Sequence, residues 1–277
     1  FYDDHPGYGS LMPLGADPLT DGELKFILQW ILEGAPEHGV VTKVADLDNL
    51  ERYAPPPFTP LDKPESGIQL HVEPFEVPAN FEREFFMYKE LNNNKPVYVN
   101  RVQIEMRSGS HHFLAYLLDS SSPFFSFAKQ LFVPNKLRDL HLSNGEDDPL
   151  VLATMAFHDF FAGTQTPRLD YSFPQGVALK LPAQTGIDLN THYVNRTDKP
   201  STGEVYMNLH TVEKATVKHE AKIINMNNTD IDLPPNRETT VTADFSASET
   251  MNIFQLFSHS HEKTVEFRVE IAGGKRD

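Results

Sequence analysis

The strongest constraint on the fold is the alternation of apolar and polar side chains that begins near residue 66. Residues 102–107 and 265–271 are the clearest examples, because every second side chain in each run is apolar. A period of two places the apolar side chains on one face of a strand. Short segments of this kind, separated by turn-forming clusters, indicate antiparallel sandwiches or barrels. We therefore expect a mainly β protein.

Before residue 66 the pattern is different. Residues 18–35 carry apolar side chains at helical spacing, Thr20 and Glu23 form a capping-box pair, and Gly34 followed by Pro36 ends the helix. A further short helix is expected near 150–161. The proline-rich stretch 54–66 is typical of a semi-rigid linker. These signals divide the chain into 1–53, the linker 54–66, a first β domain 67–224 and a partial second one, 225–277.

Composition excludes several function classes. The 39 acidic side chains exceed the 24 basic ones, which argues against a nucleic-acid partner, because phosphate backbones need a basic surface. The chain has no cysteine, which excludes disulfides, thiolate metal sites and cysteine nucleophiles within it. It also has no apolar run long enough to span a membrane as a helix. The 12 histidines are then the main candidate ligands for a transition metal.

Three histidine features stand out. His111 and His112 are neighbours, so on a regular strand they point to opposite faces, and they can share one ion only at a strand end or a bulge, or with one ring binding through Nδ1. His192 shares its strand face with other polar residues. His259 and His261 lie two apart, a natural two-point chelate. Each feature alone is also compatible with ordinary surface or structural histidines, and His158 beside Asp159 could form a dyad only through a spatial contact.

The order of these motifs resembles a known enzyme family. SHHFL at 110–114, LNTHY at 189–193 and FSHSH at 257–261 resemble the copper type II ascorbate-dependent monooxygenases, the family of peptidylglycine α-hydroxylating monooxygenase and dopamine β-monooxygenase. FPQGV at 173–177 and LPA at 181–183 look like its bacterial branch. The resemblance covers about residues 68–277. It implies antiparallel jelly-roll sandwiches, one complete here and a second partial, preceded by a short helical segment.

The resemblance also implies two copper sites. His111, His112 and His192 would form an electron-transfer site in the first sandwich, and His259 and His261 would be catalytic ligands of an oxygen-binding copper in the second. That second site also takes a methionine downstream of the two histidines, but no methionine follows Met251 here. We therefore expect the second copper site to be incomplete in this chain, and the chain to be a piece of a longer protein.

The N-terminal part has a resemblance of its own. LMPLGADPLTDGEL at 11–24 and WILEGAP at 30–36 look like the C-terminal half of a small c-type cytochrome, with Met12 as the haem axial ligand. This resemblance implies that 1–53 is a remnant of such a module. The haem-attachment motif CxxCH is absent, so haem c would be held by a segment upstream of this chain.

Three functions follow as hypotheses. The first is a copper monooxygenase that hydroxylates a C–H bond of a small-molecule or peptide substrate, using O2 and a one-electron donor such as ascorbate or a cytochrome. The second is a copper-binding or electron-transfer module without hydroxylase activity. The third is a structural or carbohydrate-binding β-sandwich whose histidines bind nothing, or zinc. Copper and a cytochrome neighbour favour a periplasmic or secreted protein.

Overall fold

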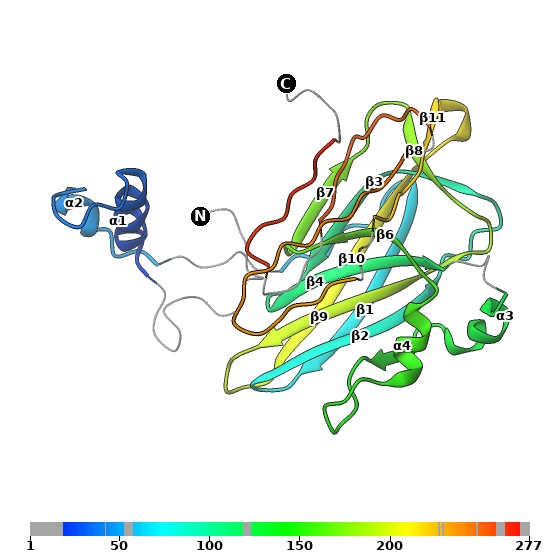
Figure 1. Ribbon diagram of the computed structural model, residues 1–277, viewed down its shortest axis with the longest axis horizontal. Helices are drawn as coiled ribbons and strands as arrows, with labels where there is room; N and C mark the ends of the chain where they lie inside the picture. Colours follow the sequence, from blue (N-terminus) through cyan, green and yellow to red (C-terminus); the bar gives the residue numbers. More distant parts are fainter. Residues whose placement is uncertain are drawn as a thin grey trace. The chain divides into compact units, whose positions relative to one another are not determined.

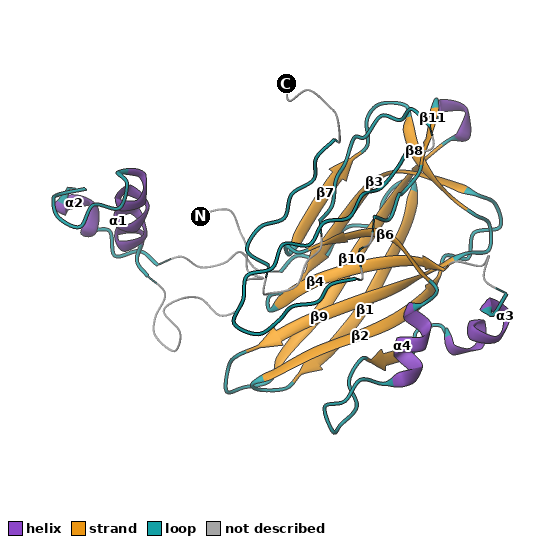
Figure 2. Cartoon of the chain, viewed as in Figure 1, coloured by secondary structure: helices purple, strands orange, loops and turns teal. Residues whose placement is uncertain are grey.

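The computed structural model describes residues 19–41, 43–52, 58–118, 123–226, 228, 230–247, 249–258 and 264–271. The chain separates into two compact units, Phe1–Asn225 and Met226–Asp277. Strands dominate and helices are few, which confirms the prediction of a mainly β protein (Figure 2).

The first unit contains two antiparallel sheets that enclose the core (Figure 1). One sheet has the order β1-β10-β3-β8-β11, with β7 also paired to β3, and the other has the order β5-β2-β9-β4-β6. β11 is the exception to the antiparallel rule, because it pairs with β8 in parallel. The strands are β1 (Gly67–Val77), β2 (Phe81–Glu90), β3 (Val97–Met106), β4 (Ser110–Leu118), β5 (Leu137–Asp139), β6 (His158–Thr164), β7 (Arg168–Ser172), β8 (Val177–Leu181), β9 (Gly186–Asn195), β10 (Ser201–Val212) and β11 (His219–Ala221).

The core lies between the inner faces of the two sheets. Val205, Met207 and Leu209 of β10 are fully buried, and so are Ile187 and Leu189 of β9. Their spacing of two is the period that sends alternate side chains to one face of a strand. The packing of apolar side chains between the sheets supplies most of the driving force for this unit, because apolar burial contributes about 25 cal/mol per Å².

Aromatic contacts connect the sheets at one end. The Phe75 ring of β1 meets the Phe85 ring of β2 and the Tyr193 ring of β9 edge-on, at centroid separations of 4.7 and 5.1 Å. The Tyr193 hydroxyl donates to the Glu204 carbonyl of β10 at 2.9 Å, so this buried phenol is also satisfied. The strand β9, which carries His192, is therefore held against the opposite sheet.

The outer face of β9 is covered by the segment that runs from 123 to 157. This segment contains α3 (Phe125–Ala128), a 3₁₀ turn (Lys129–Leu131), β5 and α4 (Pro149–Met155). Arg138 of β5 donates to the hydroxyl of Thr154 in α4 and to the carboxylate of Asp188 in β9. Polar residues on the outer face of β9 are consequently buried, with Asp188 fully enclosed.

Helix α4 is shorter than the sequence predicts. It begins after the N-cap Asp148 and ends at Met155, and the expected second half becomes strand β6 from His158. The prediction of a helix over 150–161 was therefore wrong after Met155. The aromatic run in β6 pairs with β4 instead, and cross-strand packing of this kind overrides weak helical periodicity.

The N-terminal helix agrees with its prediction. α1 spans Asp21–Leu32, with Thr20 as N-cap and a complete capping box to Glu23. The short α2 (Val44–Leu47) lies against it, joined by an ion pair between Lys25 and Asp46 at 2.6 Å. No side chain fits at Gly22, because a Cβ there would lie 2.6 Å from the Asp46 carbonyl oxygen.

The described part of the predicted linker, 58–66, is bound to the first unit. The side chain of Gln69 in β1 donates to the Leu61 carbonyl at 2.8 Å, and that of Asn208 in β10 donates to the Asp62 carbonyl at 2.9 Å. Phe58 lies over the Arg107 guanidinium at 4.3 Å. This segment therefore lies along β1 and β10 rather than forming a free spacer.

The second unit contains no helix or strand among its described residues. The alternating side chains at 265–271 are exposed, with Val265 and Ile271 more than four-fifths accessible. An alternating segment forms a sheet only when another strand satisfies its backbone groups. The second sandwich remains a prediction.

Candidate metal centre

His111, His112 and His192 come together at the outer face of the sheet that contains β4 and β9. One ring nitrogen from each lies within 4.8 Å of the others. His112 of β4 is the cross-strand partner of His192 in β9, which explains how residues 80 positions apart meet. The register of this pair shifts between Ser110 and His112, so His111 is the extra residue at the irregularity. A bulge turns a neighbouring side chain toward the same face, as the adjacent histidines require.

Two of the distances between ring nitrogens match the spacing of ligands on one ion. His112 Nδ1 lies 3.3 Å from His111 Nδ1 and 3.4 Å from His192 Nδ1. Two nitrogens bound tetrahedrally at about 2.0–2.1 Å from a metal are about 3.3–3.4 Å apart. His112 and His192 are buried and His111 is exposed, so the site opens to solvent on the His111 side.

Hydrogen bonds select the proton-bearing nitrogen of His112. Asn190 Nδ2 donates to Glu84 Oε1 at 2.9 Å, because a carboxylate only accepts. The amide oxygen of Asn190 therefore faces His112 Nε2 at 2.8 Å and accepts a hydrogen bond from its N–H group. In the neutral ring this leaves the lone pair on Nδ1, the atom that faces the other two histidines.

His192 is oriented in the same way by Glu82. Its Nε2 donates to Glu82 Oε1 at 2.8 Å, which again leaves the lone pair on Nδ1. Two lone pairs then face each other 3.4 Å apart, and a cation shared between the rings would satisfy both. Ligating histidines characteristically donate their second nitrogen to a carboxylate or carbonyl, as His112 and His192 do.

The electrostatics keep the cluster in its ligand form. Burial lowers the pKa of His192, and the neighbouring His112 and His111 lower it further against the opposing effect of Glu84. Burial, followed by the charge of His112, also lowers the pKa of His111. Burial alone would raise the pKa of Glu84, but the His112 ring, the Asn190 amide and His192 together bring it to about 2. Both shifted imidazoles therefore favour the neutral form, and Glu84 is anionic.

The residues that orient the rings were not identified from the sequence. Glu82 and Glu84 occupy alternate positions of β2, and Glu84 lies directly opposite His192. Asn190 shares its strand face with His192, which the period of two indicated. Only the pairing of β2 with β9 shows that the two glutamates reach the same place.

A second buried polar cluster lies further along the same face. The Asp188 carboxylate accepts two bonds from Arg138 Nη2, at 2.5 and 2.6 Å, and one from His158 Nε2 at 2.8 Å. His158 therefore pairs with Asp188 and not with its sequence neighbour Asp159, whose carboxylate accepts from Asn225. The cluster joins β5, β6 and β9, and its groups have no opening to solvent comparable to that of the histidines.

His259, His261 and Met12 lie outside the described residues, so the second copper site and the haem ligand stay predictions.

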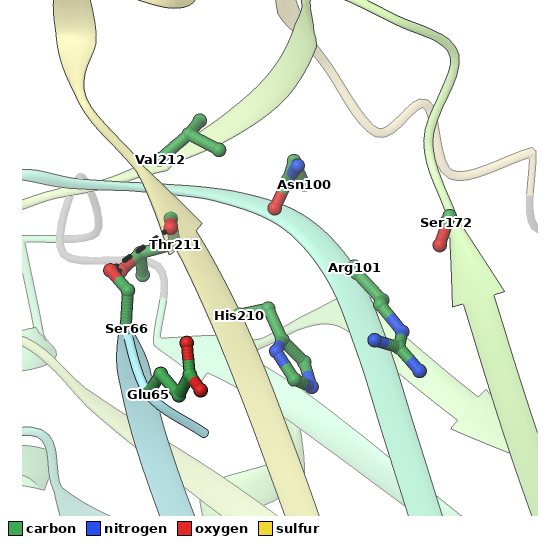
Figure 3. A pocket seen from close by; sticks show the side chains of 8 residues that line it. All are labelled: Glu65, Ser66, Asn100, Arg101, Ser172, His210, Thr211 and Val212. Carbon is green, nitrogen blue, oxygen red and sulfur yellow. Dashed lines mark hydrogen bonds between the residues drawn. The ribbon is translucent and has the colours of Figure 1, made fainter.

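A cavity of about 450 Å³, lined mostly by residues with polar side chains, opens on the other sheet (Figure 3). Arg101 and His210 lie side by side in it on neighbouring strands. Both already have partners, because Arg101 binds Asp170 through two bonds of 2.7 and 2.6 Å and His210 Nε2 lies 2.6 Å from Gln103 Oε1. Because these side chains are already paired, the cavity is a weaker candidate for binding a charged ligand than the histidine cluster is for binding a metal.

A second cavity, of about 540 Å³, borders the histidine cluster through Glu82. Phe81 and Leu142 form part of its wall, together with Asp139. A small molecule in this cavity would lie beside the carboxylate that orients His192.

Comparison with protein-family models and with curated proteins gives no match to this chain. None of the described helices is both long and apolar enough to cross a membrane.

Proposed function

We propose that His111, His112 and His192 bind one copper ion, and that the chain belongs to a copper-dependent monooxygenase. The observation that carries the proposal is the convergence of the three rings. His112 Nδ1 lies at ligand spacing from the Nδ1 atoms of His111 and His192, and hydrogen bonds direct the protons of His112 and His192 away from the site. Imidazole suits copper, and Cu²⁺ stands at the top of the divalent affinity series. Zinc also takes three histidines and is the main competing metal.

Copper at this site would supply one-electron redox chemistry. The described residues explain how such a site is held. Asn190 and Glu82 fix the rings of His112 and His192, so the ligand atoms are preorganised. His111 is exposed, which leaves the site accessible to a one-electron donor such as ascorbate or a cytochrome.

Hydroxylation of a small-molecule or peptide substrate rests on the family resemblance. In that proposal His259 and His261 bind the catalytic copper, and the protein acts in the periplasm or outside the cell, where a cytochrome bearing haem c could donate electrons. A copper electron-transfer module without hydroxylase activity is the second candidate. The triad by itself, without a second copper, would be sufficient for such a module.

Metal analysis and electron paramagnetic resonance test the copper assignment. The purified protein is loaded with Cu²⁺, and His192→Ala is compared with the control His141→Ala, which removes a partly exposed histidine paired with Asp147. We expect His192→Ala to lose one bound copper and its signal, and the control to keep both. Equal copper binding by the wild-type protein, His192→Ala and His141→Ala would contradict the assignment, and so would a preference of the wild-type protein for zinc.

Oxygen consumption separates the two candidate functions. A monooxygenase consumes O2 in the presence of ascorbate and copper, whereas an electron-transfer module is reduced by ascorbate without sustained uptake. We expect uptake that disappears in His192→Ala and persists in His141→Ala. Reduction of bound copper without uptake would favour the electron-transfer module.

A further inference from the structure

Two carboxylates of β2 stand behind the histidine cluster, and the metal chemistry described above does not by itself require both. Glu82 accepts directly from His192 Nε2 at 2.8 Å. Glu84 reaches His112 through the Asn190 amide, and its Oε2 lies 3.8 Å from His192 Nδ1. The two glutamates therefore connect to the cluster through different ligands.

The two carboxylates also determine the net charge of the site. Three neutral histidines leave a bound divalent ion with its full charge of two, and the two carboxylates supply two negative charges. Arg196 lies 3.6 Å from Glu82 and offsets part of its charge, but both side chains are at least half exposed, so this pair is weak. Glu84 is mostly buried, at 20% exposure, so solvent screens its charge less.

We propose that Glu82 and Glu84 are positioning residues whose charges neutralise a divalent ion at the triad, with Glu84 acting through Asn190. The site would therefore prefer the divalent over the monovalent state of the same metal. The inference rests on the proposed metal site. A divalent ion would give a total charge near zero, whereas a monovalent ion would leave the site with an excess negative charge. Coulomb energy scales with the charge of the ion, so each carboxylate stabilises the divalent state about twice as strongly.

The expected effects follow from this difference. Loss of a group that orients a ligand weakens metal binding by about 10–100-fold. Because the Coulomb energy is halved for Cu⁺, we expect Glu84→Gln to weaken Cu²⁺ binding by up to about 100-fold and Cu⁺ binding by up to about tenfold. A tenfold change in the ratio of the two dissociation constants corresponds to about 59 mV for a one-electron couple, so the reduction potential would rise by this amount. Glu82→Gln should change both quantities in the same direction but by less, because Glu82 is more exposed.

Competition titrations with Cu²⁺, and with Cu⁺ under anaerobic conditions, test the inference on the full chain. Glu90→Gln is the matched control, because it removes the same charge from an exposed position of the same strand. Glu82→Asp keeps the charge and should retain most of the preference of the wild-type protein for Cu²⁺. If Glu84→Gln does not fold, Glu82→Gln carries the test, since its side chain is half exposed.

The outcomes distinguish the two proposals. Equal weakening of Cu²⁺ and Cu⁺ in Glu82→Gln and Glu84→Gln would overturn the proposed role of the carboxylates and leave the metal site intact. That role would also be overturned if Glu90→Gln changed the ratio of the dissociation constants as much as Glu82→Gln and Glu84→Gln do. A wild-type protein that binds neither ion would overturn the metal site, and the inference with it.

Discussion

Replacing Arg138 by methionine should destabilise the first unit severely, because it isolates a buried charge. The Arg138 side chain is 8% exposed and that of Asp188 is fully buried, and two hydrogen bonds join them. His158 is the other partner of this carboxylate. Methionine keeps the apolar contact with the rings of Phe86 and Phe132, which the guanidinium overlies at 5.8 and 5.1 Å. The substitution thus removes the charge and spares most of the packing.

The magnitude follows from the burial of the pair. Removing one member of a buried ion pair costs about 3–5 kcal/mol, because the remaining charge stays in a medium of low polarity. An exposed pair is worth only about 0–1 kcal/mol. The double variant Arg138→Met with Asp188→Asn removes both charges and leaves His158 a hydrogen-bonding partner. We expect it to be more stable than Arg138→Met alone by about 2 kcal/mol or more.

Urea unfolding followed by circular dichroism measures these differences. For Arg138→Met we expect the midpoint to fall by about 1–2 M, because the slope increases with protein size and a unit this large lies near the upper end of about 1–3 kcal/mol per M. Arg101→Met is the matched control, because its pair with Asp170 is 37% and 53% exposed. A loss below about 1 kcal/mol for Arg138→Met, equal to that of the control, would show that the buried charge is not isolated by the substitution.

Three further outcomes are expected. Phe58→Ala should destabilise the protein by about 1 kcal/mol and speed proteolysis near residue 58, because the ring lies over Arg107 at 4.3 Å; an unchanged cleavage rate would contradict this. Gly163→Ala should cost about 1–3 kcal/mol in thermal unfolding, since its Cβ would lie 2.8 Å from the Phe113 carbonyl oxygen; an unchanged unfolding temperature would argue against such a clash. Burial raises the pKa of Glu204, but hydrogen bonds from Arg107 and His71 bring that pKa below its ordinary value. The ionised carboxylate therefore stabilises the fold at any pH above the ordinary carboxyl pKa. This stabilisation is lost as the pH falls through the lowered pKa of the folded protein. Urea titrations should therefore show Glu204→Gln less stable than the wild type at neutral pH, with the gap closing in acid; a gap independent of pH would be the contrary result.

Local patterns were sufficient for the elements of the fold that depend on neighbouring residues. The capping box of Thr20 and Glu23 marks the start of α1, because both partners lie within one helical turn. The period of two likewise places Asn190 and His192 on one face of β9. Local patterns fail after Met155, where a helical pattern gives way to a strand whose paired residues lie 40 or more positions earlier in the chain.

The candidate site required information of a different kind. The sequence is enough to recognise His111, His112 and His192 as ligand candidates. It also shows that adjacent histidines can share an ion only at a strand end or a bulge, or with one ring binding through Nδ1. Long-range strand pairing places the bulge at His111, brings Glu82 and Glu84 behind the rings, and joins His158 to Asp188. Register between distant strands determines these contacts, and register is set by which faces are buried across the whole sheet.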